Sequence, residues 1–218
     1  MDTTAGTDTL HATSDDTPYD THYDVAIVGA GPVGCALGIL LGQHGRRVVV
    51  LERWPEPYPL PRAVHYDHEI GRVLQACGLG EELAAISEPA EVYEWRNADG
   101  ATLLRFGRIG NGVSGWPESS MFNQPALEAL LAARLEALDT VEVRRGVELV
   151  ELRDVTAPAE AAVLSCRHGD HQEDIGARHV VGCDGANSTV RSLIDAPVRD
   201  LGFFYDWLIV DVVLAEPR

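Results

Sequence analysis

Lysine is absent from the 218-residue sequence, and all seventeen of its basic residues are arginine. They stand against thirty-four Asp and Glu residues, which gives a formal net charge of −17. A surface that binds nucleic-acid phosphates needs a concentration of positive charge. The composition therefore argues against a nucleic-acid partner and predicts an acidic, self-repelling surface. The hydrophobic content of 45% is that of an ordinary globular protein with a packed core.

Long apolar runs and cysteine clusters are also lacking. No stretch approaches the length of a membrane span, and the first twenty residues lack the basic and apolar regions of a signal peptide. The four cysteines, at positions 35, 77, 166 and 183, form no C-x-x-C pair and no Cys/His cluster at zinc spacing. We therefore expect a cytoplasmic protein with buried thiols, no membrane association and no metal site. Cys35 falls in the first turn of an expected helix, where its pKa could be lowered, but packing is the favoured role.

The apolar pattern divides the chain into three parts. Residues 1–22 are rich in Thr and Asp and predict a disordered tail. From Tyr23, two short apolar runs flank a glycine-rich turn and a segment with apolar residues at helical spacing. This order of strand, turn, helix and strand predicts a βαβ unit whose strands are buried on both faces. We expect the cofactor-binding domain to extend over 23–200 and a strand of a second domain to follow at 201–218.

Later segments carry weaker signals. Residues 63–79 predict a helix that is closed by Gly78, and the alternating pattern over 91–106 predicts an inserted hairpin. Residues 121–138 predict an amphipathic helix with Pro125 in its first turn and Asn123 or Gln124 as its cap. The remaining expected elements are antiparallel strands at 141–154, 161–168 and 179–183, a short helix at 188–194 and a strand at 206–214.

The glycine-rich turn contains Gly29, Gly31 and Gly34 in a G-x-G-x-x-G pattern between the first strand and the first helix. Gly29 permits a tight turn, Gly31 lets the backbone approach a pyrophosphate, and Gly34 brings the helix close to the strand. The helix N-terminus then faces the phosphate charge, and the backbone N–H of Val33 lies in the same turn.

Glu52 ends the second strand at the distance where an acidic side chain binds the ribose hydroxyls of an adenosine. A strand-end carboxylate paired with Arg46 or Arg47 is the alternative. The βαβ unit therefore predicts binding of an ADP moiety, but it does not distinguish FAD from NAD.

Several quoted segments resemble one family. "GAGPVG", "LER", "PRAVHYDHEIGRVLQACGL", "GWP", "FNQPALEALL" and "VVGCDGANSTVR" are similar to the FAD-dependent aromatic hydroxylases of the para-hydroxybenzoate hydroxylase fold. Within them, the 3-(3-hydroxyphenyl)propionate hydroxylase branch is the most similar. The resemblance implies an α/β fold, with an FAD-binding Rossmann-like βαβ domain of the glutathione-reductase type and the start of a β-sheet substrate domain.

The resemblance also implies cofactor-binding residues outside the glycine-rich turn. Arg62 and Ala63 of "PRA" and Arg53 of "LER" match positions beside FAD, and Gln124 matches a glutamine that reaches the ribityl chain. The Asp-Gly motif is represented by Asp184, Gly185 and Arg191, and the resemblance places it near the FAD pyrophosphate and in binding of the nicotinamide cofactor. Structural roles for these residues, such as a surface arginine or a helix cap, are the alternatives.

The implied reaction is hydroxylation of a phenol. NADH or NADPH reduces FAD, O₂ adds as a flavin C4a-hydroperoxide, and the distal oxygen passes to the ring. The cofactor supplies this chemistry, so no catalytic side chain is predicted. His65, His68 and Glu69 follow Arg62, and solvent-exposed positions are favoured for them over catalytic roles.

The sequence departs from the family in one respect. The second flavin motif, a Gly-Asp followed by a helix, is lacking, since the "GD" at Gly169-Asp170 lies in a polar hairpin-like context. This predicts an N-terminal portion that is inactive alone, either a fragmentary sequence, a truncated gene product or half of a split enzyme. The partners it leaves open are a second copy of the chain and a complementing C-terminal half. An aromatic polyketide hydroxylase, a catalytically silent FAD- or ADP-binding fragment and an NAD-dependent dehydrogenase remain as alternatives.

Overall fold

A computed structural model describes residues 22–57, 59–153, 161–206 and 208. Most of the predicted tail lies outside these residues, and its last residue, His22, instead begins strand β1 (His22–Val28). The strand predicted at 206–214 also lies almost wholly outside the described residues. The part of the chain that the structure describes contains no helix long and apolar enough to cross a membrane.

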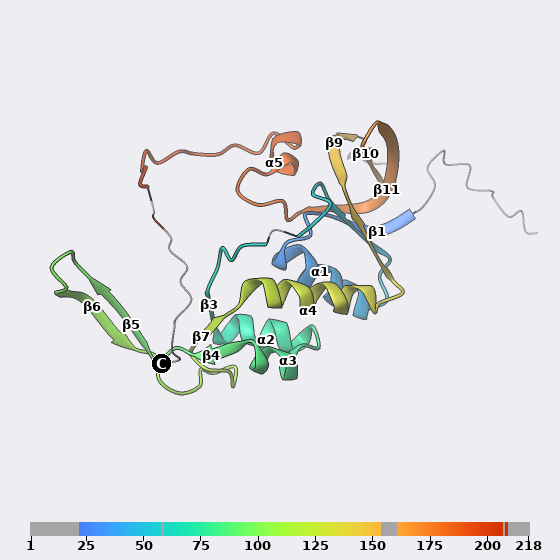
Figure 1. The fold of residues 1–218 in the computed structure, drawn as a ribbon. Helices are drawn as coiled ribbons and strands as arrows, with labels where there is room; N and C mark the ends of the chain where they lie inside the picture. Colours follow the sequence, from blue (N-terminus) through green and yellow to red (C-terminus); the bar gives the residue numbers. More distant parts are fainter. Residues whose placement is uncertain (1–21, 58, 154–160, 207, 209–218) are drawn as a thin grey trace, which may run out of the picture.

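A six-stranded sheet forms the centre of the molecule, with the order β8-β2-β1-β11-β10-β9 (Figure 1). The strands other than β1 are β2 (Val48–Glu52), β8 (Val141–Arg145), β9 (Val147–Arg153), β10 (Ala162–His168) and β11 (His171–Gly182). Strands β8, β2, β1 and β11 are parallel, whereas β10 is antiparallel to both β9 and β11. In this register Val28 pairs with Gly182, so β1 and β11 end side by side.

Strands β1 and β2 are buried on both faces, as their continuous apolar runs predicted. On one face, Ile27 and Val50 pack in a core with helix α1 (Pro32–Gln43) and helix α4 (Gln124–Glu136). On the other face, Val49 belongs to a second core with residues of β9, β10 and β11. These three strands therefore continue the sheet and also cover its opposite face.

Three expectations about the strands and helices were wrong in detail. The predicted helix at 63–79 begins as a strand, β3 (His65–Asp67), and becomes helix α2 only at His68–Ala76. The Asp67 side chain caps α2 by accepting hydrogen bonds from two backbone N–H groups, which fixes the start of the helix. Strand β8 and the end of β11 are parallel to their neighbours rather than antiparallel, because they join the βαβ sheet.

Short elements surround α2 and α4. Strand β7 (Ser119–Phe122) pairs with β3 and with β4 (Ser87–Pro89), and helix α3 (Gly80–Ala85) precedes β4. Neither β4 nor α3 was predicted. The α4 cap is Asn123, whose side chain accepts a hydrogen bond from the Ala126 N–H.

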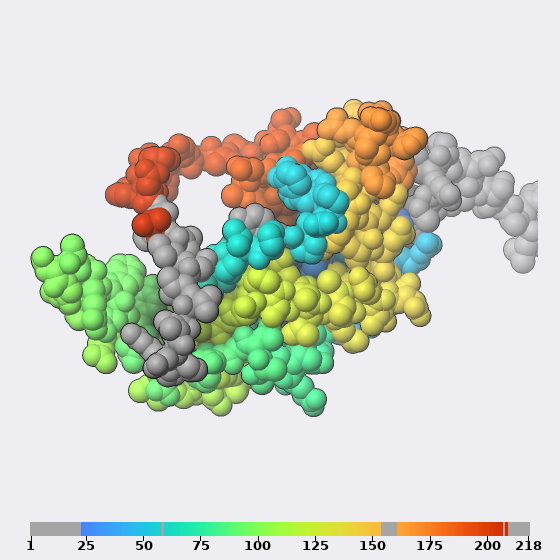
Figure 2. Space-filling model, in the orientation of Figure 1, coloured from blue at the N-terminus to red at the C-terminus, as the bar shows by residue number. Residues whose placement is uncertain are grey.

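The inserted hairpin is confirmed, with strands β5 (Val92–Arg96) and β6 (Thr102–Gly107). Figure 2 shows this hairpin, in green, projecting from one end of the molecule. Helix α5 (Thr189–Leu193), which the sequence also predicted, lies beyond the end of β11 (Figure 1). The chain that follows α5, in red, extends away from the sheet (Figure 2).

Candidate cofactor-binding site

The glycine turn, residues 29–34, connects β1 to α1 as predicted. Gly29 has a φ of +105°, which side-chain-bearing residues rarely adopt, and its N–H donates to the Leu51 carbonyl at 2.7 Å. A Cβ on Gly34 would lie under 3.0 Å from the Gly29 carbonyl oxygen, so only glycine lets the helix approach the turn this closely. A Cβ on Gly31 would meet nothing within 4 Å. The backbone at Gly31 therefore borders open space.

The N-terminus of α1 faces the same space. It has Gly31 as its N-cap, without a side-chain capping hydrogen bond, and its first turn carries no acidic residue. The Val33 side chain is 71% exposed and takes little part in packing, so the backbone N–H groups of this turn are the groups that a phosphate could bind. Helix N-termini of this kind present N–H donors and a positive dipole end, which suit a phosphate group.

Glu52 lies at the end of β2 and is bound to the glycine turn. Its carboxylate accepts hydrogen bonds from the Ala30 N–H at 2.9 Å and the Trp54 N–H at 3.0 Å. Among the described residues it forms no ion pair with Arg46 or Arg47, and the Arg47 guanidinium lies 5.9 Å from the centre of the Tyr23 ring. The carboxylate therefore lies beside the glycine turn, where ribose binding was predicted. Arg53 is exposed, and its guanidinium lies 5.3 Å from the centre of the Trp54 ring.

The Asp-Gly turn, residues 183–188, lies directly against the glycine turn. The Cys183 N–H donates to the Val28 carbonyl at 2.7 Å, and a Cβ on Gly29 would lie under 3.0 Å from the Cys183 carbonyl. The parallel pairing of β1 with β11 brings these turns together, although more than 150 residues separate them. The structure thus joins two motifs that the sequence could connect only through a resemblance.

Asp184 organises this second turn. Its carboxylate accepts hydrogen bonds from the Ser188 hydroxyl at 2.5 Å and from the Thr189 and Val190 N–H groups at 2.6 and 3.1 Å. Partial burial acts to raise the pKa of Asp184, but the hydrogen bonds together outweigh it and lower the pKa. Arg191 donates to the Ala186 carbonyl at 2.7 Å, and Gly185 has a φ of +81° with open space where a Cβ would lie.

Gln124 joins the start of α4 to the segment before β3. Its side-chain oxygen accepts hydrogen bonds from the backbone N–H groups of Arg62 and Ala63, at 2.7 and 2.6 Å, and its amide nitrogen donates to Glu128. Gln124 is only 8% exposed, one of three buried polar residues in the described part of the chain. It therefore holds the Arg62–Ala63 segment in place, a role the sequence did not indicate.

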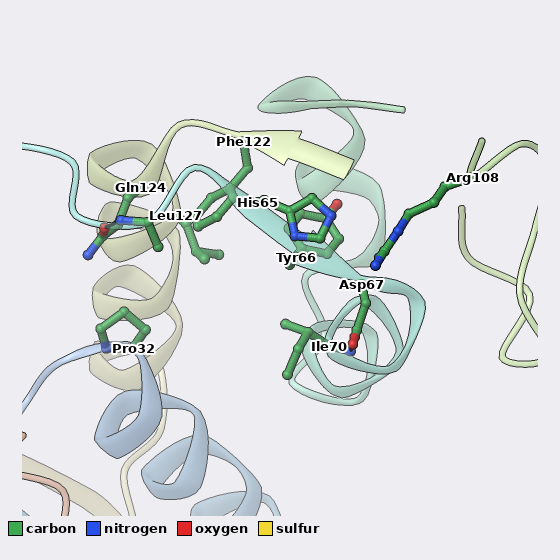
Figure 3. A pocket seen from close by; sticks show the side chains of 10 residues that line it. Pro32, His65, Tyr66, Asp67, Ile70, Arg108, Phe122, Gln124 and Leu127 are labelled. Atoms are coloured by element: carbon green, nitrogen blue, oxygen red, sulfur yellow. Dashed lines mark hydrogen bonds between the residues drawn. The ribbon is translucent and has the colours of Figure 1, made fainter. Parts of the chain in front are cut away.

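A cavity of about 470 Å³ opens between the glycine turn and the segment that Gln124 holds (Figure 3). This volume lies within the range of small-molecule sites. The lining residues are Pro32, Ala63, His65, Tyr66, Asp67, Ile70, Arg108, Phe122, Gln124 and Leu127. Most of them come from β3, α2 and the start of α4, and Pro32 comes from the glycine turn.

His65, His68 and Glu69 occupy different surroundings. His65 is exposed but lines the cavity, where its Nε2 lies 2.6 Å from the Ser119 hydroxyl oxygen. His68 contacts the Ser114 hydroxyl at 3.1 Å, and Glu69 forms a surface ion pair with Arg72. Sequence reasoning missed Arg108, which also lines the cavity, because it follows a hairpin strand without any motif around it.

The cysteines have the structural role that the sequence favoured. Cys35 is 4% exposed, and burial raises its pKa to about 12 rather than lowering it. Burial likewise raises the pKa of Cys77, Cys166 and Cys183. Among the described residues, no group of three or more His, Cys, Asp or Glu side chains is arranged to hold a metal ion.

The fold and the two turns define a dinucleotide-binding domain of the βαβ class. Residues 22–218 match the family model described as "FAD binding domain", and the chain belongs to this family. The cradle fits FAD, because the open space at Gly31, the N-terminus of α1 and the Glu52 carboxylate supply the donors and the acceptor that an ADP moiety needs. This finding resolves the choice between FAD and NAD that the glycine pattern left open.

Named relatives are hydroxylases. The chain is 41% identical over 191 residues to a probable NADH-specific resorcinol 4-hydroxylase of Rhodococcus jostii, a match that covers 88% of this chain and 36% of that protein. It is 33% identical over 192 residues to a 3-(3-hydroxy-phenyl)propionate/3-hydroxycinnamic acid hydroxylase of Mycolicibacterium gilvum, covering 88% of this chain and 33% of that protein. The chain thus spans about a third of the length of these relatives.

Solved structures of monooxygenases share the fold. A p-nitrophenol 4-monooxygenase from Pseudomonas putida superposes with a TM-score of 0.71 at 26% identity, over 79% of this chain and 43% of that one. An anhydrotetracycline hydroxylase from Streptomyces rimosus superposes with a TM-score of 0.66 at 30% identity, over 80% and 34%. The resemblance to FAD-dependent aromatic hydroxylases and the predicted fold class are both confirmed.

Proposed function

We propose that the chain is the FAD-binding part of a monooxygenase that hydroxylates a phenolic ring with O₂ and a reduced nicotinamide cofactor. A single-ring phenol is the expected substrate, since the named relatives act on resorcinol and on hydroxyphenyl acids. NADH is the expected donor, because the resorcinol hydroxylase relative is described as NADH-specific. These assignments concern the activity of a whole hydroxylase, of which this chain corresponds to about a third.

The observation that carries the proposal is the meeting of two turns at the ends of β1 and β11. A simple NAD-dependent dehydrogenase needs the glycine turn, but it offers no reason for the Asp-Gly turn to pack against Gly29. Nor does it account for the junction of Gln124 with Arg62 and Ala63 beside a cavity. Pro32 of the glycine turn, Ala63 and Gln124 line one cavity, and the Asp-Gly turn packs against the glycine turn. A long cofactor with two nucleotide halves would extend past all three features.

The residues of these features have distinct proposed roles. The glycine turn and the α1 N-terminus bind the pyrophosphate, Glu52 binds the adenosine ribose, and Gln124 together with the 62–63 backbone orients the far half of the cofactor. Asp184 holds the second turn in position through three hydrogen bonds. Bound FAD would supply hydride acceptance and O₂ activation, while the protein positions the ring and excludes water.

The test is a titration of the purified 218-residue chain with FAD, followed through quenching of flavin fluorescence. We expect saturable binding that weakens when Glu52→Gln removes the ribose acceptor, whereas Glu56→Gln, an exposed carboxylate a few residues away, leaves binding unchanged. NADH is then added without oxygen, and bleaching of the flavin absorbance is measured with and without resorcinol.

The outcomes separate the candidate functions. FAD binding with bleaching that resorcinol accelerates supports the hydroxylase. FAD binding without reduction by NADH is the result expected both of an N-terminal portion that is inactive alone and of a silent flavin-binding module. Binding of NAD in place of FAD indicates a dehydrogenase. A substituted polycyclic phenol that accelerates reduction more than resorcinol would indicate a polyketide hydroxylase.

A further inference from the structure

One end of the cavity is polar. His65 and Asp67 lie there on β3, and Arg108, the residue that follows β6, lies there as well (Figure 3). None of these three residues belongs to the glycine turn or to the Asp-Gly turn. In Figure 3 the guanidinium of Arg108 points toward the space between His65 and Asp67.

Arg108 is held in place without a carboxylate. Its backbone N–H donates to the Glu91 carbonyl at 2.8 Å, and its guanidinium lies 5.2 Å from the centre of the Phe106 ring, a cation–π contact. In the part of the chain that the structure describes, Arg108 has no ion-pair partner. A half-buried arginine of this kind presents a planar fork of donors that suits an anionic oxygen.

Asp67 does not neutralise this arginine by an ion pair. One oxygen of its carboxylate accepts the Glu69 and Ile70 N–H groups, so the charge of Asp67 is directed at the N-terminus of α2. The positive end of the α2 dipole and the negative charge of Asp67 therefore partly cancel. Among the described residues that line the cavity, Arg108 is the one arginine, and no carboxylate pairs with it.

His65 is a second hydrogen-bonding group at this end of the cavity. Burial lowers its pKa, the nearby Arg108 lowers it further, and Asp67 raises it by less. The Ser119 hydroxyl, on a residue only 3% exposed, lies 2.6 Å from His65 Nε2 and fixes the ring orientation. The second ring nitrogen remains available to a ligand as a donor or an acceptor, according to the tautomer.

Apolar side chains form the walls next to this polar end. The Tyr66 ring is 5% exposed and meets the Phe122 ring edge to face, with centroids 5.5 Å apart and an interplanar angle of 63°. Ile70 also lines this part of the cavity, whereas Pro32 lies at the end away from Arg108 (Figure 3). An aromatic ring fits such a wall, since aromatic groups favour edge-to-face and offset contacts.

We propose that Arg108 binds the ionised oxygen of the phenolic substrate, with His65 as the second, positioning hydrogen-bond partner; this rests on the proposed function. The phenol loses its proton to water, and the electron pair of the broken O–H bond stays on the oxygen that faces the guanidinium. A phenolate ring is richer in electrons than a phenol ring, which favours attack on an electrophilic oxygen. Charge-assisted hydrogen bonds of this kind are about twice as strong as neutral ones.

The probe is 4-nitrophenol, whose phenolate form absorbs visible light and whose phenol form does not. It is titrated with the 218-residue chain at a pH where both forms are present, with FAD and without it. We expect the visible absorbance to rise on binding, since the site favours the phenolate. Arg108→Gln should weaken binding by about tenfold to a hundredfold and abolish the rise.

A matched control removes the same charge outside the cavity. Arg105 lies on β6 and is exposed, so Arg105→Gln should leave both the affinity for 4-nitrophenol and the absorbance rise unchanged. His65→Asn should reduce the absorbance rise while Arg108 still binds the probe. Thermal melts of each variant, followed by circular dichroism, check that the fold is intact.

The result that overturns the proposal is a folded Arg108→Gln variant that binds the phenolate as the unaltered chain does. Binding of 4-nitrophenol only in its protonated form, or no binding to the unaltered chain, also overturns it. The readout needs neither NADH nor oxygen, so failure here is distinguishable from failure of the proposed hydroxylase function, which is decided by flavin binding and reduction.

Discussion

Gly31 and Gly34, the second and third glycines of the turn, should respond differently to the same added methyl group, one by losing cofactor affinity and the other by losing stability. In Gly34→Ala, the new Cβ would lie under 3.0 Å from the Gly29 carbonyl oxygen and 3.3 Å from the Cys183 Cβ. In Gly31→Ala, the new Cβ would meet nothing within 4 Å. One substitution therefore perturbs packing, and the other perturbs only the space that we assign to the cofactor phosphates.

The clash at Gly34 cannot be relieved cheaply, because both partners are fixed. Gly29 is held by its hydrogen bond to Leu51, and on its other side it abuts the Cys183 carbonyl. Helix α1 must move instead, and α1 carries core residues such as Ile39. Overpacking of this kind typically costs about 1–3 kcal/mol. For a chain of this size, each kcal/mol lowers the melting temperature by about 2–4 °C, so a fall of about 2–12 °C is expected.

Gly31→Ala should leave the free energy of unfolding within about 1 kcal/mol of the starting value, because the backbone there is extended, with a φ of −74°. Its expected effect is weaker FAD binding. Melting is followed by circular dichroism, and FAD affinity by flavin fluorescence. An unchanged melting temperature for Gly34→Ala would refute the packing argument, and unchanged FAD affinity for Gly31→Ala would refute the assignment of the open space.

Three further predictions follow from single contacts. Gln124→Ala removes the acceptor of two backbone N–H groups and should lower the free energy of unfolding by about 1–3 kcal/mol. Amide hydrogen exchange at residues 62–63 should become faster, and unchanged protection there would contradict the view that Gln124 holds this segment in place. The folded state lowers the pKa of Asp184, so its ionised form contributes stability that is fully present above the unfolded pKa of about 4 and is lost as pH falls through the folded pKa. The difference in unfolding free energy between the unaltered chain and Asp184→Asn, measured by urea unfolding, should therefore narrow below about pH 4. A difference that stays constant with pH would count against this. Cys35, with its pKa raised to about 12, should resist alkylation by iodoacetamide in the native chain at pH 8 and react after unfolding, as mass spectrometry of the modified peptide would reveal.

Local signals predicted the first third of the fold well. Continuous apolar runs identify β1 and β2 because strands buried on both faces have no polar side to alternate. The glycine spacing predicted the turn, and the structure gives Gly29 and Gly34 a steric reason, whereas the space beside Gly31 is open. Signals were weaker at residues 63–79, where a helical pattern concealed β3, because three residues are too few to show a strand period.

The sequence by itself determined the βαβ unit, the helix caps near Asn123 and the hairpin, since all of these depend on residues close together in the chain. Only the tertiary structure decided that β8 and β11 run parallel to β1 and β2, and that the Asp-Gly turn lies against Gly29. It also decided that Gln124, His65 and Arg108 share one cavity. Pairing between strands and contacts across a cavity join residues tens to more than a hundred positions apart, and no local pattern records which distant segments meet.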